Sequence, residues 1–290
     1  MQGSSVQSAI RRYLQFLQYE QNASEHTVQA YQTDLHQFLA VITTQTGRTL
    51  SPQELSGDLI ESYSNWLTAQ GYRPTTISRK FAALRSFLHY QGEIGLSETP
   101  NMADGLNVPH EPRKTPRMLD SDELARLLEA PRSSQSPGPI RDAAILALLY
   151  ETGFRATELV QLRLVDVQLN QARIRCPSDL VESLSIPASI DLIRAYLQDG
   201  RPHLVRDPLE DILFLNQRGK GLTRQGLWLV VKRWAAAAGI RGTLSPHTLR
   251  HTRARDLLQR GVNRRDVQRF LGLSSPNAIR IHTRKFKDDE

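Results

Sequence analysis

Two arginines of this sequence each have a second ionisable residue at helical spacing. Arg155 precedes Glu158 by three residues, and His247 precedes Arg250 by three residues. Side chains three residues apart share one face of a helix, so the members of each pair can act together. The planar guanidinium of arginine suits bidentate contacts with phosphate. On their own, the pairs are more typical of ordinary ion pairing and polarity on a helix surface. A phosphate-binding site is the alternative, and the motifs around the pairs decide between the two.

A metal site is a weaker interpretation of the same residues. His247 and His251 stand four residues apart, which is a spacing that metal-binding helices use. However, Arg250 lies between them and no carboxylate is near in the sequence. Cys176 is the only cysteine, which excludes an intrachain disulfide and a cysteine zinc cluster. We therefore expect no metal and no cofactor.

The first part of the chain has the pattern of a small helical domain, which we place at residues 1–106. Its apolar residues recur at helical spacing in four runs, and no strand pattern interrupts them. Ser24 is the expected N-cap of the second helix, and Pro74 and Thr75 open the fourth. The four runs lie at residues 10–17, 28–42, 59–67 and 77–88.

A segment rich in proline and charge follows, and we interpret residues 107–119 as a linker. The remainder, residues 120–290, forms a second domain. Ser121 is the expected N-cap of its first helix, and an apolar helix is expected from Asp142 to Tyr150. Two short β-type runs, residues 172–176 and 183–188, predict a small hairpin or sheet. The fold class is therefore mainly α with a small β-sheet.

The charge of the chain indicates a polyanionic partner. The formal net charge is +7, and most of the basic residues are arginines. Between residues 241 and 287 there are twelve lysines and arginines, against Asp256 and Asp266. Such an excess attracts nucleic acid without regard to sequence. A merely soluble basic surface is the alternative.

A membrane location is not expected. The longest apolar stretch, residues 143–150, is far shorter than the roughly 20 residues of a membrane span. The first residues are polar and lack an apolar signal core. We expect a cytoplasmic protein.

Several segments together resemble the tyrosine recombinase, or phage integrase, family, and particularly its Xer-like bacterial members. Three lie in the second domain: TGFRATEL (152–159), SPHTLRH (245–251), and LGLSS with IHT (271–283). Two lie in the first domain, at residues 24–31 and 75–87. They follow in the order and spacing of the family over nearly the whole chain. The resemblance implies a two-domain DNA-breaking-rejoining fold, with a core-binding (SAM-like) domain before a catalytic-type domain.

The chemistry of that family explains its residue types. A tyrosine attacks a DNA phosphate, while two arginines and a histidine stabilise the charge that develops on its oxygens. A lysine on a β-hairpin protonates the leaving oxygen. The resemblance places Arg155, His247 and Arg250 at the phosphate-holding positions, with Glu158 bracing Arg155.

Three positions depart from the family pattern. Glu182 stands where the hairpin lysine belongs, and Leu273 replaces a histidine or tryptophan. His282 occupies the position of the nucleophilic tyrosine, and no tyrosine occurs after Tyr196. An attack by His282 itself is a minor alternative, because the pocket is built around a phenol and lacks its acid.

The resemblance also implies contacts with double-stranded DNA outside the phosphate pocket. The helix that begins near Pro74 approaches the major groove in relatives, and the turn at residues 217–223 resembles one that touches the DNA backbone. The candidate DNA-binding residues are Thr75, Thr76, Arg79, Lys80, Arg85, Lys220, Thr223, Arg224 and Arg253.

The resulting expectation is a DNA-binding protein of recombinase fold that does not exchange strands alone. It would act as a non-cutting recombination partner, beside an active recombinase or another protein, or as a DNA-organising factor. The alternative is an active site-specific recombinase or integrase that uses non-standard residues or a nucleophile from a partner chain.

Overall fold

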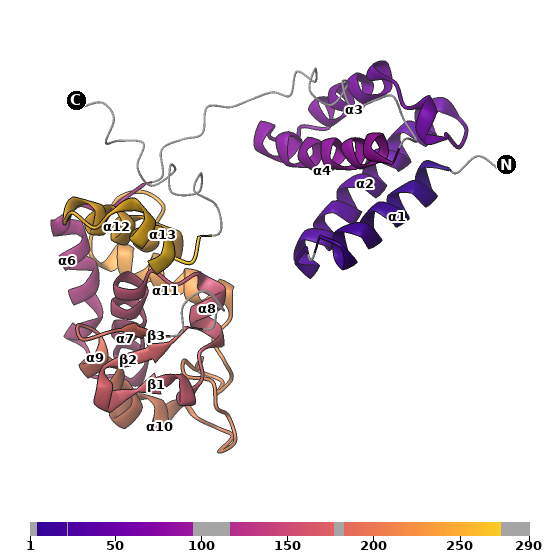
Figure 1. Cartoon of the computed structure of the whole chain (residues 1–290). Coiled ribbons are helices and arrows are strands. Elements are labelled where there is room, and N and C mark those ends of the chain that lie inside the picture. Colours follow the sequence, from indigo (N-terminus) through magenta and orange to yellow (C-terminus); the bar gives the residue numbers. More distant parts are fainter. Residues whose placement is uncertain (1–4, 22, 95–116, 177–182, 274–290) are drawn as a thin grey trace. The chain divides into compact units, whose positions relative to one another are not determined.

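A computed structural model describes residues 5–21, 23–94, 117–176 and 183–273. The chain divides into two compact units, residues 1–113 and 114–290. The expected class, mainly α with a small sheet in a two-domain recombinase architecture, is confirmed (Figure 1). None of the described helices is both long and apolar enough to cross a membrane.

The first unit is a bundle of helices, as its apolar spacing predicts. Large apolar side chains from every helix meet in one core, in which Tyr13, Phe38 and Phe81 are almost fully buried. Ser24 caps the second helix by accepting a hydrogen bond from the backbone N–H of Thr27. The helices are α1 (Val6–Tyr19), α2 (Glu25–Thr46), α3 (Gly57–Ala69) and α4 (Pro74–Glu93), with a short 3-10 turn at Pro52–Glu54.

The second unit is built around α7 (Pro137–Thr152), which is buried on nearly all sides (Figure 1). Its apolar residues form the centre of the core, and neighbouring helices pack around it. These are α6 (Ser121–Glu129), α8 (Ala156–Gln161), α9 (Ile190–Ala195), α10 (Arg201–Leu204), α11 (Arg224–Ala237), α12 (Pro246–Gln259) and α13 (Arg264–Phe270), with a π-helical stretch at Tyr196–Gly200 and short 3-10 turns at Ala130–Ser133, Leu164–Asp166 and Leu169–Gln171.

A three-stranded antiparallel sheet lies in this unit, in the order β1-β2-β3. Its strands are β1 (Val167–Gln168), β2 (Arg173–Arg175) and β3 (Ser183–Ser185). Ile174 is the register partner of both Val167 and Leu184, and its side chain enters the core. The sequence pattern predicts β2 and β3, whereas β1 is too short to produce a period.

Two helix starts differ from the sequence-based expectation. Asp120, and not Ser121, is the N-cap of α6, because its carboxylate accepts from the N–H of Glu123 in a capping box. α7 begins at Pro137, five residues before Asp142, because proline is well tolerated in the first turn of a helix.

Candidate phosphate-binding site

Arg155 is placed by the abrupt end of α7. Gly153 adopts a left-handed conformation (φ 63°) that ends the helix, and Arg155 is the N-cap of α8 two residues later. Glu158 accepts from the backbone N–H of Arg155 at 2.6 Å and from its Nη1 at 2.8 Å. Nη2 of Arg155 donates to the carbonyl of Gly272 at 2.7 Å. These bonds hold the guanidinium in place, and the side chain is still 40 % exposed to solvent.

Arg250 reaches the same turn from α12. Its Nη1 donates to the carbonyl of Gly153 and its Nη2 to the carbonyl of Leu271, each at 2.5 Å. Since Arg155 holds the next carbonyl, that of Gly272, the two guanidiniums converge on consecutive residues after α13. This arrangement places side chains from residues 155 and 250 in one site.

The two guanidiniums carry like charges and lie close enough for Arg155 to lower the pKa of Arg250. Burial and the positive charge of Arg155 lower the pKa of Arg250 to about 10, while Glu158 opposes the shift. Arg250 therefore stays protonated at neutral pH, and a bound anion would stabilise its buried positive charge. A phosphate between Arg155 and Arg250 would relieve this repulsion.

His247 lies one turn before Arg250 on α12 and is exposed as a residue. Partial desolvation of its imidazole lowers its pKa, and the charges of Arg250 and Arg155 lower it further. The imidazole is thus mainly neutral at pH 7, and it can donate one hydrogen bond and accept another. His251 is nearby, with 6.5 Å between the ring centroids. Among the described residues, no group of three or more His, Cys, Asp or Glu could hold a metal ion.

The substituted positions fall partly outside the structure's described ranges. Glu182 and His282 lie outside the described residues. Leu273 is described and partly buried, and it packs against a small apolar cluster that includes Val267 and Leu271. Its side chain cannot donate a hydrogen bond, so whatever polar support a histidine or tryptophan would supply is absent at this position.

The candidate DNA-binding residues of α4 divide into two groups. Thr75, Arg79 and Arg85 are exposed, and Thr76 is partly exposed. Lys80 is only 6 % exposed, and its ammonium group donates to Asp34 at 2.9 Å. The expectation of a surface contact therefore does not suit Lys80, whose side chain is turned into the bundle to pair with a buried carboxylate.

The turn before α11 presents a second group of candidates. Thr223 is the N-cap of α11, where its hydroxyl accepts from the N–H of Gly226 at 3.0 Å. Lys220 and Arg224 are exposed on either side of it. Arg253 differs, because its guanidinium stacks between the rings of Tyr150 and Phe270, 5.5 and 5.7 Å from their centroids. This packing ties α12 to its neighbours, and DNA contact by Arg253 stays a prediction.

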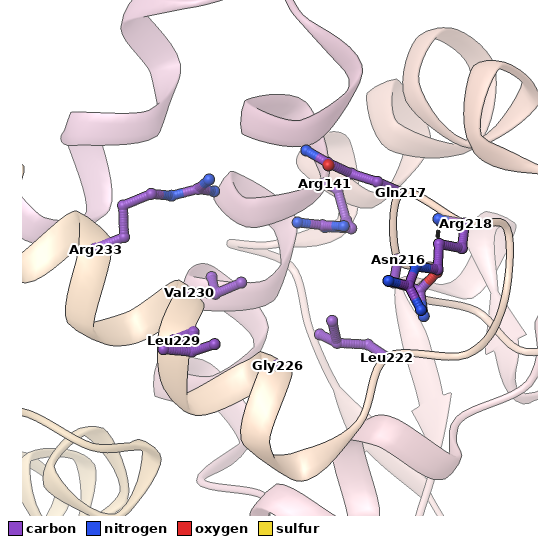
Figure 2. A pocket seen from close by; sticks show the side chains of 9 residues that line it. All are labelled: Arg141, Asn216, Gln217, Arg218, Leu222, Gly226, Leu229, Val230 and Arg233. Atoms are coloured by element: carbon purple, nitrogen blue, oxygen red, sulfur yellow. Dashed lines mark hydrogen bonds between the residues drawn. The ribbon is translucent and has the colours of Figure 1, made fainter.

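A depression of about 560 Å³ lies between this turn and α11, and sequence reasoning did not predict it (Figure 2). Its arginines are largely committed elsewhere: Arg141 donates to Asp142 and to the carbonyl of Leu215, and Arg233 also pairs with Asp142. None of the residues of the arginine site lines it. The lining residues are Arg141, Asn216, Gln217, Arg218, Leu222, Gly226, Leu229, Val230 and Arg233.

The backbone partners of the two arginines were not predicted from the sequence, whereas Glu158 was. They are backbone carbonyls of Gly153, Leu271 and Gly272, and a carbonyl has no signature in a sequence. The one available signal is the glycine directly after a long apolar helix, which predicts a left-handed helix end.

This chain is similar in sequence to known proteins over nearly its whole length. Residues 10–92 match the model of the phage integrase N-terminal SAM-like domain, and residues 117–288 match the phage integrase family. The tyrosine recombinase XerC of Herpetosiphon aurantiacus is 35% identical over 287 residues, covering 98% of this chain and 92% of that protein. The tyrosine recombinase XerD of Listeria innocua is 35% identical, covering 93% and 92%.

Solved structures show the same fold. The Tn1549 transposon integrase in complex with a circular intermediate DNA has a TM-score of 0.71 at 15% identity, covering 94% of each chain. The XerH site-specific recombinase bound to palindromic difH substrate has a TM-score of 0.70 at 23% identity, covering 92% of this chain and 78% of that one. The family models and the relatives together show that this chain belongs to the phage integrase family of tyrosine recombinases.

Proposed function

We propose that this protein binds duplex DNA within a site-specific recombination system and does not exchange strands by itself. One observation carries the proposal: Arg155 and Arg250, 95 residues apart in sequence, converge on one turn and leave further N–H donors for a phosphate. The relatives are named tyrosine recombinases, and solved neighbours are bound to DNA, which supports duplex DNA as the partner.

The tyrosines of the second unit support the non-cutting half of the proposal. Residues 114–290 contain two tyrosines, Tyr150 and Tyr196, and both are described. Tyr196 is fully buried, and its hydroxyl accepts from the N–H of Leu215 at 3.1 Å. The hydroxyl of Tyr150 donates to Asp256 at 2.7 Å.

Both phenols are held in the protonated form. Burial raises the pKa of Tyr196, and burial together with the Asp256 carboxylate raises the pKa of Tyr150. An attacking phenolate is therefore disfavoured at either position. Glu182 stands at the family's lysine position, Leu273 at its histidine or tryptophan position, and His282 at its tyrosine position. This unit therefore lacks a nucleophile and an acid of the usual kind.

In this role the protein occupies a recombination site beside an active recombinase, or organises DNA there. The second candidate function is an active recombinase or integrase with non-standard residues or a partner-supplied nucleophile. Its support is the 35% identity over nearly the whole chain to proteins named as recombinases, together with the retained arginines.

The test begins with a selection of bound fragments from source genomic DNA, followed by nicked suicide substrates built on the enriched fragment. We expect salt-sensitive duplex binding and no covalent complex that survives denaturing electrophoresis. A covalent adduct would overturn the non-cutting role and favour the second candidate. Absent or salt-insensitive duplex binding would overturn the proposal as a whole.

A His282→Tyr variant separates the possible deficiencies. If Glu182 and Leu273 also disable the site, this variant binds the same fragment and still forms no adduct. If an adduct appears, the missing phenol is the one deficiency, and the site retains an acid that the sequence does not identify.

A further inference from the structure

A buried carboxylate in the first unit holds two consecutive cations of one helix. Asp34 on α2 is 2 % exposed. It accepts from Nζ of Lys80 and from Nη2 of Arg79 on Oδ1, both at 2.9 Å, and from Nη1 of Arg79 on Oδ2. The helices α2 and α4 pack against each other in the bundle (Figure 1). Asp34 therefore accepts hydrogen bonds from both terminal nitrogens of Arg79 and from the ammonium group of Lys80 at the same time.

The two cations have different surroundings. Lys80 is buried, and its ammonium also lies 5.4 Å from the ring centroid of Tyr72. The Tyr72 hydroxyl in turn accepts from the side-chain amide of Gln37 at 3.0 Å. Lys80 thus balances the charge of Asp34 inside the bundle, since a buried carboxylate needs a paired cation.

The cluster of Asp34, Arg79 and Lys80 has a net positive charge, which lies at the surface. One carboxylate and two cations leave the cluster with a net charge of plus one. The Arg79 side chain is 52 % exposed, whereas the Lys80 side chain is 6 % exposed. The net positive charge of the cluster is therefore exposed to solvent at Arg79. Thr75 is exposed one turn earlier on the same face of α4.

Anchoring on both terminal nitrogens also removes most of the rotational freedom of the guanidinium. An arginine that is ordered before binding loses less entropy when it binds, and its remaining N–H groups point in fixed directions. Fixed donor directions are what the recognition of a base edge in the major groove requires.

We propose that Asp34 is a positioning residue that orients Arg79 to read a base pair of bound duplex, while Lys80 cancels the carboxylate's charge. This inference rests on the proposed DNA-binding function. Asp34 does not touch the DNA in this arrangement. It sets the sequence preference of the protein through Arg79, and it leaves the general attraction for DNA unchanged.

The chain offers a charge-matched test. The double variant Asp34→Asn, Lys80→Met removes one charge of each sign, so the cluster keeps a net charge of plus one and keeps Arg79. Replacing a buried ion pair with neutral groups is often tolerated, and circular dichroism with thermal unfolding checks that the variant is folded. The single variants Arg79→Ala and Lys80→Met complete the set.

The measurement is selection from a random-sequence duplex pool, together with the affinity for one fixed non-specific duplex over a range of salt concentrations. We expect Arg79→Ala to relax preference at one base-pair position by roughly tenfold to a hundredfold. The double variant should relax the same position and keep the wild-type non-specific affinity and salt slope. Lys80→Met should keep the preference and lower the salt slope by about one ion.

The inference is overturned if the folded double variant keeps the wild-type preference at every position. It is also overturned if the wild-type protein binds the pool in a salt-dependent way without any preference, a result that leaves the proposed function intact. If the wild-type protein binds no duplex at all, the proposed function fails, and this inference fails with it.

Discussion

Arg250 and Arg79 are both anchored arginines, but their acceptors differ. Arg250 is buried and donates to two backbone carbonyls, whereas Arg79 is half exposed and donates to a buried carboxylate. Carbonyls have no net charge, so they fix a guanidinium and leave its full charge for an anion. A carboxylate also fixes a guanidinium, but it cancels the positive charge. A second cation, Lys80, is therefore needed for the cluster to keep a net positive charge. The first arrangement is suited to holding a phosphate, and the second to orienting a side chain.

The largest effect on duplex binding is expected from removing Arg250. Arg250→Ala leaves the carbonyls of Gly153 and Leu271 without their partner, so we expect the free energy of unfolding to fall by about 1–3 kcal/mol. Duplex affinity should fall roughly tenfold to a hundredfold, because a charged donor to phosphate is lost. Chemical denaturation and fluorescence anisotropy measure the two quantities.

The matched control is Arg269→Ala, which removes the same charge from a side chain that is 77 % exposed on α13. Surface substitutions of this kind change stability by about 0.5 kcal/mol or less. If both variants lose equal stability and equal affinity, Arg250 is only one more surface cation, and its contrast with Arg79 disappears.

An intermediate effect on duplex binding, with a larger loss of stability, is expected from substituting the glycine that carries one of the acceptors. A Cβ at Gly153 would lie 2.7 Å from Cδ2 of Leu271, and φ is +63°. We expect Gly153→Ala to destabilise the protein through backbone strain and overpacking, by about 2–4 kcal/mol in total. It should also weaken duplex binding, since Leu271 and the carbonyl of Gly153 both hold Arg250.

Gly47→Ala separates the two causes. Gly47 has nearly the same φ, +68°, at the end of α2, but a Cβ there would meet nothing within 4 Å. It should therefore show the backbone strain alone, about 1 kcal/mol, with unchanged duplex affinity. An equal loss of stability in the two alanine variants would show that the contact with Leu271 is unimportant.

The smallest effect is expected from His247. Its pKa is lowered below the usual 6.5 by desolvation and by Arg250 and Arg155, so it gains a proton only as the pH falls below that value. Its protonation should strengthen duplex binding a few-fold as the pH falls from neutral to well below 6.5. The sign for stability is opposite: the folded state binds fewer protons than the unfolded state, so the DNA-free protein loses stability as the pH falls.

His247→Gln should remove both trends, whereas His203→Gln, a substitution at an exposed histidine of α10, should leave them in place. Anisotropy and denaturation at a series of pH values provide the measurement. Identical pH profiles for His247→Gln and the wild-type protein would exclude a contact between His247 and the phosphate.

The sequence predicts local pairs well and distant partners poorly. The spacing of Arg155 and Glu158 predicts their contact, because an N-cap residue and the residue three positions later lie close together at the start of a helix. Neither spacing nor composition shows that Lys80 is buried by an ion pair with Asp34, which lies 46 residues earlier in the sequence. Helix ends depend on competition between neighbouring caps, so Asp120 replaces the expected Ser121.

The family resemblance identifies the candidate residues of the phosphate site. The structure adds the groups that hold their side chains in place. The carbonyls of Leu271 and Gly272 hold the two arginines, yet any residue type carries a carbonyl. The sequence therefore predicts which side chains would meet a phosphate, but it does not predict which groups hold the two arginines close together against their mutual repulsion.

The most direct test of the account is a scan in which each backbone phosphate of the selected duplex is replaced, one at a time, by a neutral methylphosphonate. The account predicts one phosphate whose neutralisation weakens the wild-type protein strongly and weakens Arg155→Ala and Arg250→Ala much less, with a coupling free energy of about 1–3 kcal/mol. If Arg155→Ala, Arg250→Ala and Arg269→Ala respond alike to every neutral phosphate, the two arginines do not share a phosphate, and the central claim is wrong.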